Sequence, residues 1–165
     1  AELKDGRLLV VWRGSNSATT PGRKWFSVSS DGGLTLSPSA EWKYDDGSSF
    51  YSPSSIHQFV RHSVNHKLYW VGNITPTPPA GNGPRYPLVM AEVDEKLAAL
   101  KKSTVTLVDD RPDSADVNYQ LSNFSLYENR ETHQLELFLT TYGQEVGQGN
   151  WMNADCRHYA LKIEE

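Results

Sequence analysis

The chain has 165 residues, of which 38% are hydrophobic, and a formal net charge of −4. This length is sufficient for one hydrophobic core, and the absence of a basic excess argues against nucleic acid as a partner. The single cysteine excludes an intrachain disulfide and a cysteine-cluster zinc site, and no apolar run is long enough for a membrane span. We therefore expect no metal, cofactor, nucleic acid or membrane as a partner.

The composition predicts an all-β fold. The chain contains 5 Trp, 8 Tyr, 5 Phe, 12 Gly and 9 Pro, and strands favour aromatic residues whereas turns favour Gly and Pro. In chain order, the runs predicted as strands are 8–12, 25–28, 34–42, 55–60, 68–72, 86–93, 105–108, 120–126, 135–140 and 158–163. Only residues 94–102 have helical character, and we expect one short turn there.

These strands fit the four-stranded blade repeat of a β-propeller. Residues 54–108 form one complete blade, 1–44 the second to fourth strands of the blade before it, and 118–165 the first three strands of the blade after it. We expect a single partial domain over 1–165, the carboxy-terminal half of a six-bladed propeller, with the remaining blades upstream. The outer strand missing from the last blade would come from that upstream segment. A ten-stranded β-sandwich is the alternative fold.

Residues 29–36 read Ser-Ser-Asp-Gly-Gly-Leu-Thr-Leu and lie between two predicted strands. An Asp-Gly pair in this setting predicts a hairpin turn. Asp31 can accept hydrogen bonds from backbone N–H groups of its own turn, and the hydroxyls of Ser29 and Thr35 can close the ring. The pattern Ser29-x-Asp31-x-Gly33-x-Thr35 resembles the Asp-box (BNR repeat) of the sialidase-like β-propeller glycoside hydrolases. An Asp-Gly hairpin without that relationship is the alternative.

The blade repeat divides the loops between two rims of the propeller. The long loops, which we call the long-loop rim, are 13–22, 45–53, 73–85, 109–117 and 141–155. The short loops, which we call the short-loop rim, are 30–33, 61–67, 94–103 and 127–134. Long loops on one rim of a rigid scaffold commonly carry function. The long-loop rim carries Arg, carboxylate, amide and aromatic side chains, Asn16, Asn73, Asn150 and Trp151 among them, and this combination predicts a carbohydrate site.

Three segments supply the main candidates for that site. One of them is 111–120, with Asn123 just inside the following strand, and a solvated crossover loop is the alternative for it. Asp45, Asp46, Tyr51 and His57 lie on the run into an innermost strand, where they would face the central funnel. The alternative is a polar turn, a packing tyrosine and a core histidine. Arg85 ends a proline-rich loop, and its planar guanidinium suits bidentate binding of a substrate carboxylate. An exposed arginine beside a structural loop is the alternative for Arg85.

The resemblance implies a glycoside hydrolase that acts on an acidic or complex glycan. In sialidases three arginines hold the substrate carboxylate, a tyrosine paired with a glutamate is the nucleophile and an aspartate is the acid/base. No residue of this chain matches that signature position by position. On the predicted rim Asp46 and Tyr51 are the candidates for catalysis. The candidates for substrate binding are Arg13, Asp45, His57, Arg85, Arg111 and Tyr142.

The same motif occurs in propellers that are not hydrolases, so a non-catalytic module that binds carbohydrate or protein through this rim is the alternative function. The resemblance also implies an extracellular or periplasmic location. A half-propeller leaves apolar blade faces and unpaired strand edges exposed. We therefore expect a homodimer that covers these faces, either as a closed two-fold ring or through one blade face.

Overall fold

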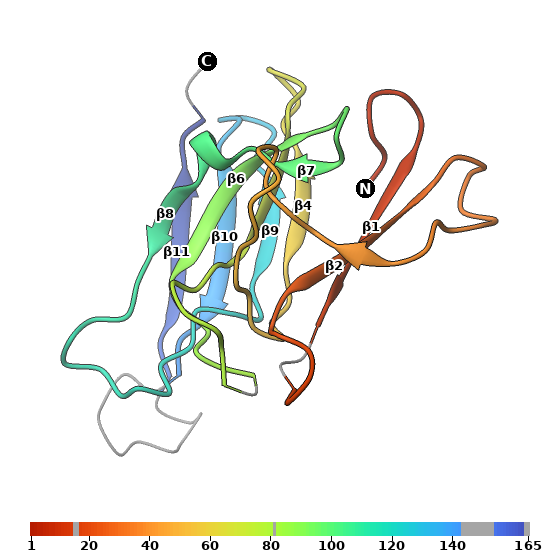
Figure 1. The fold of residues 1–165 in the computed structure, drawn as a ribbon. Helices are drawn as coiled ribbons and strands as arrows, with labels where there is room; N and C mark the ends of the chain where they lie inside the picture. The colour runs from red at the N-terminus through yellow and green to blue at the C-terminus, as the bar shows by residue number, and fades with distance from the viewer. Residues whose placement is uncertain (15–16, 81, 143–153, 164–165) are drawn as a thin grey trace.

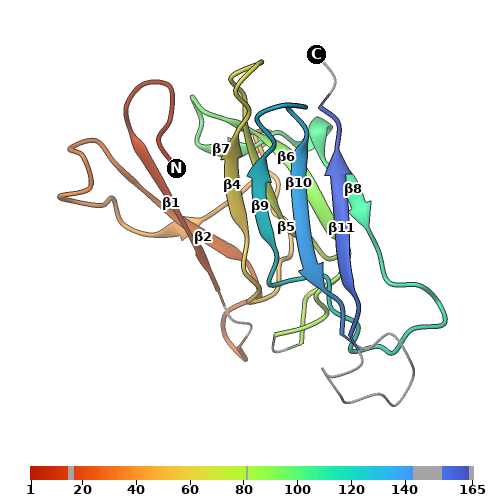
Figure 2. The same ribbon diagram turned by 180° about the vertical axis from the view of Figure 1, so that it is seen from behind.

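The computed structural model describes residues 1–14, 17–80, 82–142 and 154–163. In this part of the chain the fold is all-β, with eleven strands in three antiparallel sheets, none of them closed, and one 3-10 turn (Figures 1 and 2). The sheets follow one another along the chain, over residues 8–41, 58–109 and 125–161.

The first sheet has the order β1-β2-β3 and consists of β1 (Leu8–Arg13), β2 (Lys24–Ser29) and β3 (Ala40–Glu41). The strand predicted over 34–42 begins only at Ala40. The N–H of Thr35 bonds to the side chain of Asp31 instead of a neighbouring strand, and Pro38 has no N–H to donate. Residues before β1 fold back on it through the pair Glu2 and Leu8, which covers part of its outer edge.

The second sheet contains β4 (Gln58–Arg61), β5 (Leu68–Asn73), β6 (Leu88–Asp94), β7 (Ala99–Leu100) and β8 (Thr106–Asp109). The strands β4, β5, β6 and β8 pair in that order, as expected for a complete four-stranded blade, and β7 adds a short pair at the end of β6. The helical turn predicted over 94–102 is misplaced, because Ala98 has a φ of 53° and turns the chain back into β7. The 3-10 turn lies at Lys102–Thr104.

The third sheet consists of β9 (Ser125–Glu128), β10 (Leu135–Thr140) and β11 (Cys156–Leu161), in the order β9-β10-β11. The strand predicted to start at residue 120 begins at Ser125, because Gln120 pairs with loop residues and Asn123 has a φ of 56°. Similarly, β4 begins at Gln58, so His57 precedes that strand.

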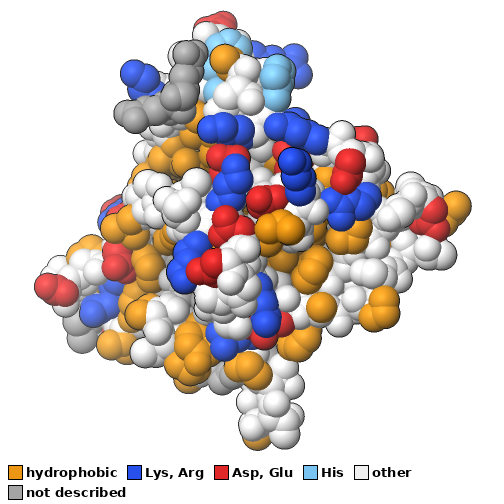
Figure 3. Space-filling view, turned by 45° about the horizontal axis from the view of Figure 1, so that its top comes forward, with side chains coloured by type: hydrophobic (Ala, Val, Ile, Leu, Met, Phe, Trp, Pro, Cys, Tyr) orange, Lys and Arg blue, Asp and Glu red, His pale blue; other side chains and the backbone are white. Residues whose placement is uncertain are grey.

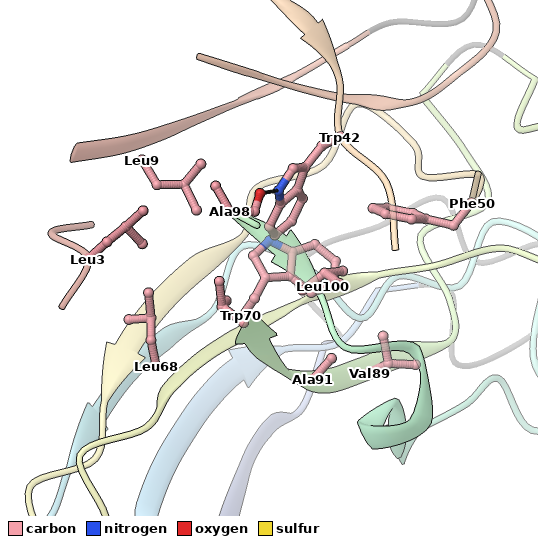
Figure 4. Close-up of a cluster of buried hydrophobic side chains, with 11 residues drawn as sticks. Leu3, Leu9, Trp42, Phe50, Leu68, Trp70, Val89, Ala91, Ala98 and Leu100 are labelled. Carbon is pink, nitrogen blue, oxygen red and sulfur yellow. Dashed lines mark hydrogen bonds between the residues drawn. The ribbon is translucent and has the colours of Figure 1, made fainter. Parts of the chain in front are cut away.

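Two hydrophobic cores lie on the two faces of the second sheet. The core shared with the first sheet contains Trp42, whose ring centroid lies 5.8 Å from that of Trp70 and whose Nε1 donates to the carbonyl of Ala98 (Figure 4). The Phe59 ring lies 5.9 Å from the Trp42 ring, between centroids. The other core includes Val71 and lies against the third sheet. Because both faces of the second sheet are covered, all six residues of β5 are buried.

Candidate functional site

Most loops of the predicted long-loop rim lie at one end of the sheets, the lower end in Figure 1. They contact one another through the backbone, so that each loop positions the next. The linking hydrogen bonds run from Ser52 to Gly22 (3.1 Å), Thr75 to Tyr51 (2.9 Å), Leu121 to Arg85 (3.0 Å) and Gln120 to Tyr142 (2.9 Å). Candidates Tyr51, Arg85 and Tyr142 therefore belong to one connected surface. Asn16, Asn150 and Trp151 lie outside the described residues.

The buried side chain of Asn73 fixes the middle of this rim. Its Nδ2 donates to the carbonyls of Arg85, Pro87 and Leu121 at 3.0, 3.1 and 3.0 Å. The Asn73 carbonyl accepts a 2.7 Å bond from Ser52 Oγ. One amide thus joins three segments of the rim, and it fixes the backbone on which Arg85 is placed.

A cavity of about 550 Å³ opens beside Arg85. The guanidinium of Arg85 donates to the carbonyl of Asn82 at 3.2 Å and to Gln120 Oε1 at 3.3 Å. Tyr86 and Asn118 also line the cavity. Among the described residues the lining contains no carboxylate, so Arg85 has no anionic partner there. Burial, followed by the positive charge of Arg13, lowers the pKa of Arg85.

Lys24 of β2 is fully buried. Its ammonium donates to the carbonyls of Pro53 and Ser55 at 3.1 and 2.7 Å. Burial, with smaller effects from the charges of Arg13 and Arg85, lowers the pKa of Lys24 to about 7. Arg13 is the partner of Lys24 in the β1–β2 register. We call Arg13, Lys24 and Arg85 the basic cluster.

His57 lies beside the basic cluster, and burial, then the charges of Lys24 and Arg13, lowers its pKa to about 3. The imidazole is therefore neutral at neutral pH. Its Nδ1 is buried and has no hydrogen-bond partner in the described structure. The ring lies 5.9 Å from both Phe59 and Trp70, which makes His57 part of the packing at the base of the rim.

Asp45 and Asp46 do not lie with these residues, contrary to the expectation from the sequence. Asp45 Oδ1 accepts the N–H of Lys102 at 3.0 Å, and Asp46 Oδ2 lies 2.8 Å from the Lys102 ammonium. The adjacent Tyr44 pairs with Leu100 of β7, so this half of the 45–53 loop runs to the short-loop rim before the chain returns at Tyr51 (Figure 1). Hydrogen bonds from Lys102 and then Ser48 hold the pKa of Asp46 well below its usual range. Asp46 is thus an ionised structural carboxylate.

The short-loop rim is a surface of paired charges. Figure 3, which brings this end forward, shows acidic and basic side chains next to one another. Arg61 and Glu95 lie 2.7 Å apart, and Lys101 forms an ion pair with Glu92. The basic cluster differs from this surface, because the bonds that Lys24 and Arg85 donate go to main-chain carbonyls and to an amide oxygen, not to carboxylates.

Tyr51 and Arg111 have packing partners on the long-loop rim. The guanidinium of Arg23 lies 3.8 Å from the centre of the Tyr51 ring. Arg111 donates to the carbonyl of Ala115 at 2.6 Å and lies 5.5 Å from the centre of the Tyr86 ring. Tyr51 is thus covered by a cation, and Arg111 closes its own loop and supports one wall of the cavity.

Residues 29–36 form the hydrogen-bonded turn that the sequence predicts. Asp31 Oδ1 accepts the N–H of Thr35 at 2.9 Å and the hydroxyl of Ser29 at 2.7 Å, and Oδ2 accepts the Thr35 hydroxyl at 2.6 Å. Gly33 has a φ of 94°, and its N–H donates to Ser29 Oγ at 2.8 Å. The hydrogen bonds that Asp31 accepts lower its pKa to about 2, and the bond from the Thr35 side chain has the largest effect. The motif is a structural element of the first sheet.

Sequence reasoning missed Lys24 as a member of the rim. Lysine is rarely buried, and Lys24 stands at the edge of an apolar run, where nothing local distinguishes it from a solvated residue. Tyr119 and Gln120 belong to the third candidate segment, and Gln120 was also predicted as the first residue of a strand. Their place beside Arg85 depends on a parallel pair between distant loop residues.

Within the described residues no three His, Cys, Asp or Glu side chains are arranged to hold a metal ion. The same part of the chain contains no helix with the length and apolar character needed to cross a bilayer. No protein family model matches this sequence, and neither a curated protein nor a solved structure matches it.

Proposed function

We propose that this chain forms part of a sialidase-like β-propeller that binds an acidic glycan at the long-loop rim. The observation that carries the proposal is Arg85, which lines a cavity whose described lining contains no carboxylate. Cations gathered without counterions favour an anionic ligand, and an arginine binds a carboxylate through two parallel hydrogen bonds.

The scaffold part of this proposal draws support from two features. Three antiparallel sheets follow one another along the chain, and the middle sheet contains a four-stranded succession. The Asp-box hydrogen bonds lie in the turn between β2 and β3. In the blade repeat these two strands are the third and fourth strands of one blade. Repeated sheets of this kind bury their faces against their neighbours.

The lining of the cavity suits a sugar as well as a carboxylate. Tyr86 offers an aromatic surface, and Asn118 and Gln120 offer amide groups to hydroxyls. The Arg85 guanidinium donates one bond to Gln120 Oε1 at 3.3 Å and one to the carbonyl of Asn82 at 3.2 Å. Its remaining N–H groups are available to a ligand. In this assignment Arg85 orients the ligand, and the charges of Arg13 and Lys24 add positive potential.

Hydrolysis of that glycan is the second candidate function, favoured by the resemblance of residues 29–36 to the Asp-box. A glycosidase of the usual kind needs two carboxyl groups about 5–10 Å apart across the scissile bond. The predicted carboxylates Asp45 and Asp46 lie at the short-loop rim, bonded to Lys102. The geometry of the described residues therefore supports binding better than catalysis.

Calorimetric titration with sialic acid and with an uncharged hexose tests the proposal. We expect the acid to bind, the hexose to bind far more weakly, and Arg85→Ala to reduce affinity for the acid about tenfold or more, because a charge-assisted hydrogen bond is lost. Arg130→Ala, which changes an exposed arginine between β9 and β10, is the matched control and should bind like the wild type. Equal binding of the acid by wild type and Arg85→Ala would overturn the proposal. Release of sugar from an aryl sialoside by the chain would favour the hydrolase.

A further inference from the structure

Asn82 and Gly83 form the only Asn-Gly pair in the sequence, and both residues line the cavity beside Arg85. In water an asparagine followed by glycine loses its side-chain amide faster than other asparagines do. The reason is that glycine has no Cβ to hinder the approach of its nitrogen to the asparagine side chain. The reaction converts a neutral amide into a carboxylate. The wall of this cavity therefore contains a residue that can change its own charge.

The surroundings of this pair leave the reaction unhindered. The Asn82 side chain is exposed, and among the described residues its amide takes part in no hydrogen bond. The N–H of Gly83 donates one bond to the carbonyl of Ala80, and its length of 3.4 Å lies beyond the usual range for such bonds. Apart from its chain neighbours, no atom lies within 4 Å of the place that a Cβ on Gly83 would take. The nitrogen of Gly83 is therefore open to the side chain of Asn82.

Asn118 lies on the same cavity and provides an internal comparison. It is exposed like Asn82, but its Nδ2 donates a 2.8 Å bond to Asp116 Oδ1, which also accepts its N–H at 2.8 Å. The residue that follows is Tyr119, whose bulky side chain is buried. Because Asn118 is held in place and has a hindered neighbour, we expect it to deamidate far more slowly than Asn82.

We propose that Asn82 is a deamidation site whose products neutralise Arg85. The nitrogen of Gly83 loses its proton to a base in solvent and attacks Cγ of Asn82. A C–N bond forms, the Cγ–Nδ2 bond breaks, and ammonia leaves. Water then opens the resulting succinimide at one of its carbonyl carbons. In balance, an amide and water become a carboxylate and ammonium, with no oxidation or reduction.

Both products of this reaction place a carboxylate beside Arg85. Opening at Cγ leaves an aspartate side chain at position 82, on the lining of the cavity. Opening at the main-chain carbonyl carbon gives isoaspartate, in which the main chain continues through the side chain and the former carbonyl becomes a free carboxylate. The oxygen of that carbonyl is the one that accepts the 3.2 Å bond from Arg85 Nε.

A carboxylate at this place supplies the anionic partner that the described lining of the cavity lacks. A carboxylate accepts a stronger hydrogen bond from a guanidinium than a neutral carbonyl does. The modified chain thus carries its own competitor for an anionic ligand of Arg85. The covalent change is independent of the glycan, whereas its effect on affinity rests on the proposed function.

Incubation of the wild-type chain at mildly alkaline pH, followed by tandem mass spectrometry of its peptides, tests the covalent step. We expect Asn82 to show the mass change of an amide that becomes an acid long before Asn118 does. An isoaspartate-specific methyltransferase should label the same peptide. Gly83→Ala is the matched control, because a Cβ fits there without contact and the φ of Gly83 lies outside the left-handed region. It should remain unmodified while the wild type converts.

Phenylglyoxal, which adds to free guanidinium groups, tests the effect on Arg85 without any glycan. Labelling of Arg85 should fall in the incubated wild type and in Asn82→Asp, with the exposed Arg130 as the internal reference. Gly83→Ala after incubation should label like its own fresh sample. In parallel, the incubated wild type should bind sialic acid about tenfold more weakly than the fresh chain, because a charge-assisted hydrogen bond is lost to the internal carboxylate.

Two results would overturn the proposal. The first is deamidation at Asn82 that is no faster than at Asn118, or no faster than in Gly83→Ala. The second is unchanged labelling of Arg85 after Asn82 has been converted. A fresh chain that does not bind sialic acid would refute the proposed function instead, and the labelling of Arg85 would still decide between modification with and without an effect on this arginine.

Discussion

The ammonium group of Lys24 donates a 2.7 Å hydrogen bond to the main-chain carbonyl of Ser55. This contact joins β2 of the first sheet to the run that enters β4 of the second. Because the partner is a neutral carbonyl and the side chain is fully buried, the positive charge is stabilised far less than it would be in water.

The pH dependence of stability should reveal this buried lysine. Its pKa is lowered from 10.5 to about 7 in the folded chain, so the unfolded chain binds more protons above pH 7. The free energy of unfolding therefore rises as the pH increases from about 7 to 9. Urea unfolding should show this rise in the wild type and a flatter profile in Lys24→Met. Parallel profiles for the two proteins would contradict the assignment.

His57 should produce a second pH dependence on the acidic side. Its pKa is lowered from 6.5 to about 3, chiefly by burial, so between those values the unfolded chain binds a proton that the folded chain does not. Stability should fall as the pH drops from about 6.5 toward 4.5, and His57→Leu should lose less stability over that range. The control is His66→Asn, because His66 is exposed with a φ of 57°, a conformation that asparagine tolerates. Thermal unfolding at several pH values provides the measurement.

Local pattern was sufficient to predict most strands, and interactions between distant residues explain where it failed. The apolar run from Leu68 predicts a strand buried on both faces, and β5 is such a strand. The strand predicted to start at residue 34 starts late because the Asp31 carboxylate accepts the N–H of Thr35. This side chain competes with a neighbouring strand for the backbone donor, and strand propensity does not include that competition.

The candidate site was predicted less completely than the fold. The rim positions of Tyr51, Arg85 and Tyr142 follow from the blade repeat, because successive loops of an antiparallel blade lie at alternate ends of its strands. Asp45 was assigned to the wrong rim because its N–H bonds to the carbonyl of Leu100, a pairing between segments far apart in the sequence. The burial of Lys24 likewise depends on carbonyls that a later segment supplies.

Replacement of Asn73 should destabilise the chain and weaken the rim. Asn73→Ala removes an amide NH₂ group whose two protons are shared among three main-chain carbonyls at a fully buried position. Since each stranded buried partner costs about 1–3 kcal/mol, we expect a loss of at least about 2 kcal/mol in urea unfolding. Asn118→Ala, at an exposed position near the same cavity, should change stability by less than about 0.5 kcal/mol. Equal effects of the two substitutions would contradict the central role of Asn73.

The Asp-box turn should affect stability without affecting the rim. Asp31→Ala leaves the Thr35 N–H and the hydroxyls of Ser29 and Thr35 without their shared acceptor. We expect a lower midpoint of thermal unfolding, while titration with sialic acid gives the wild-type affinity, because the turn makes no contact with the basic cluster. The pKa of Asp31 is lowered to about 2, so the stability that this carboxylate contributes is present above its ordinary pKa near 3.8 and is lost as the pH falls toward 2. Asp31→Ala should therefore lose less stability than the wild type between pH 4 and 2. A variant with unchanged thermal stability and abolished ligand binding would place Asp31 in the binding site and refute its structural role.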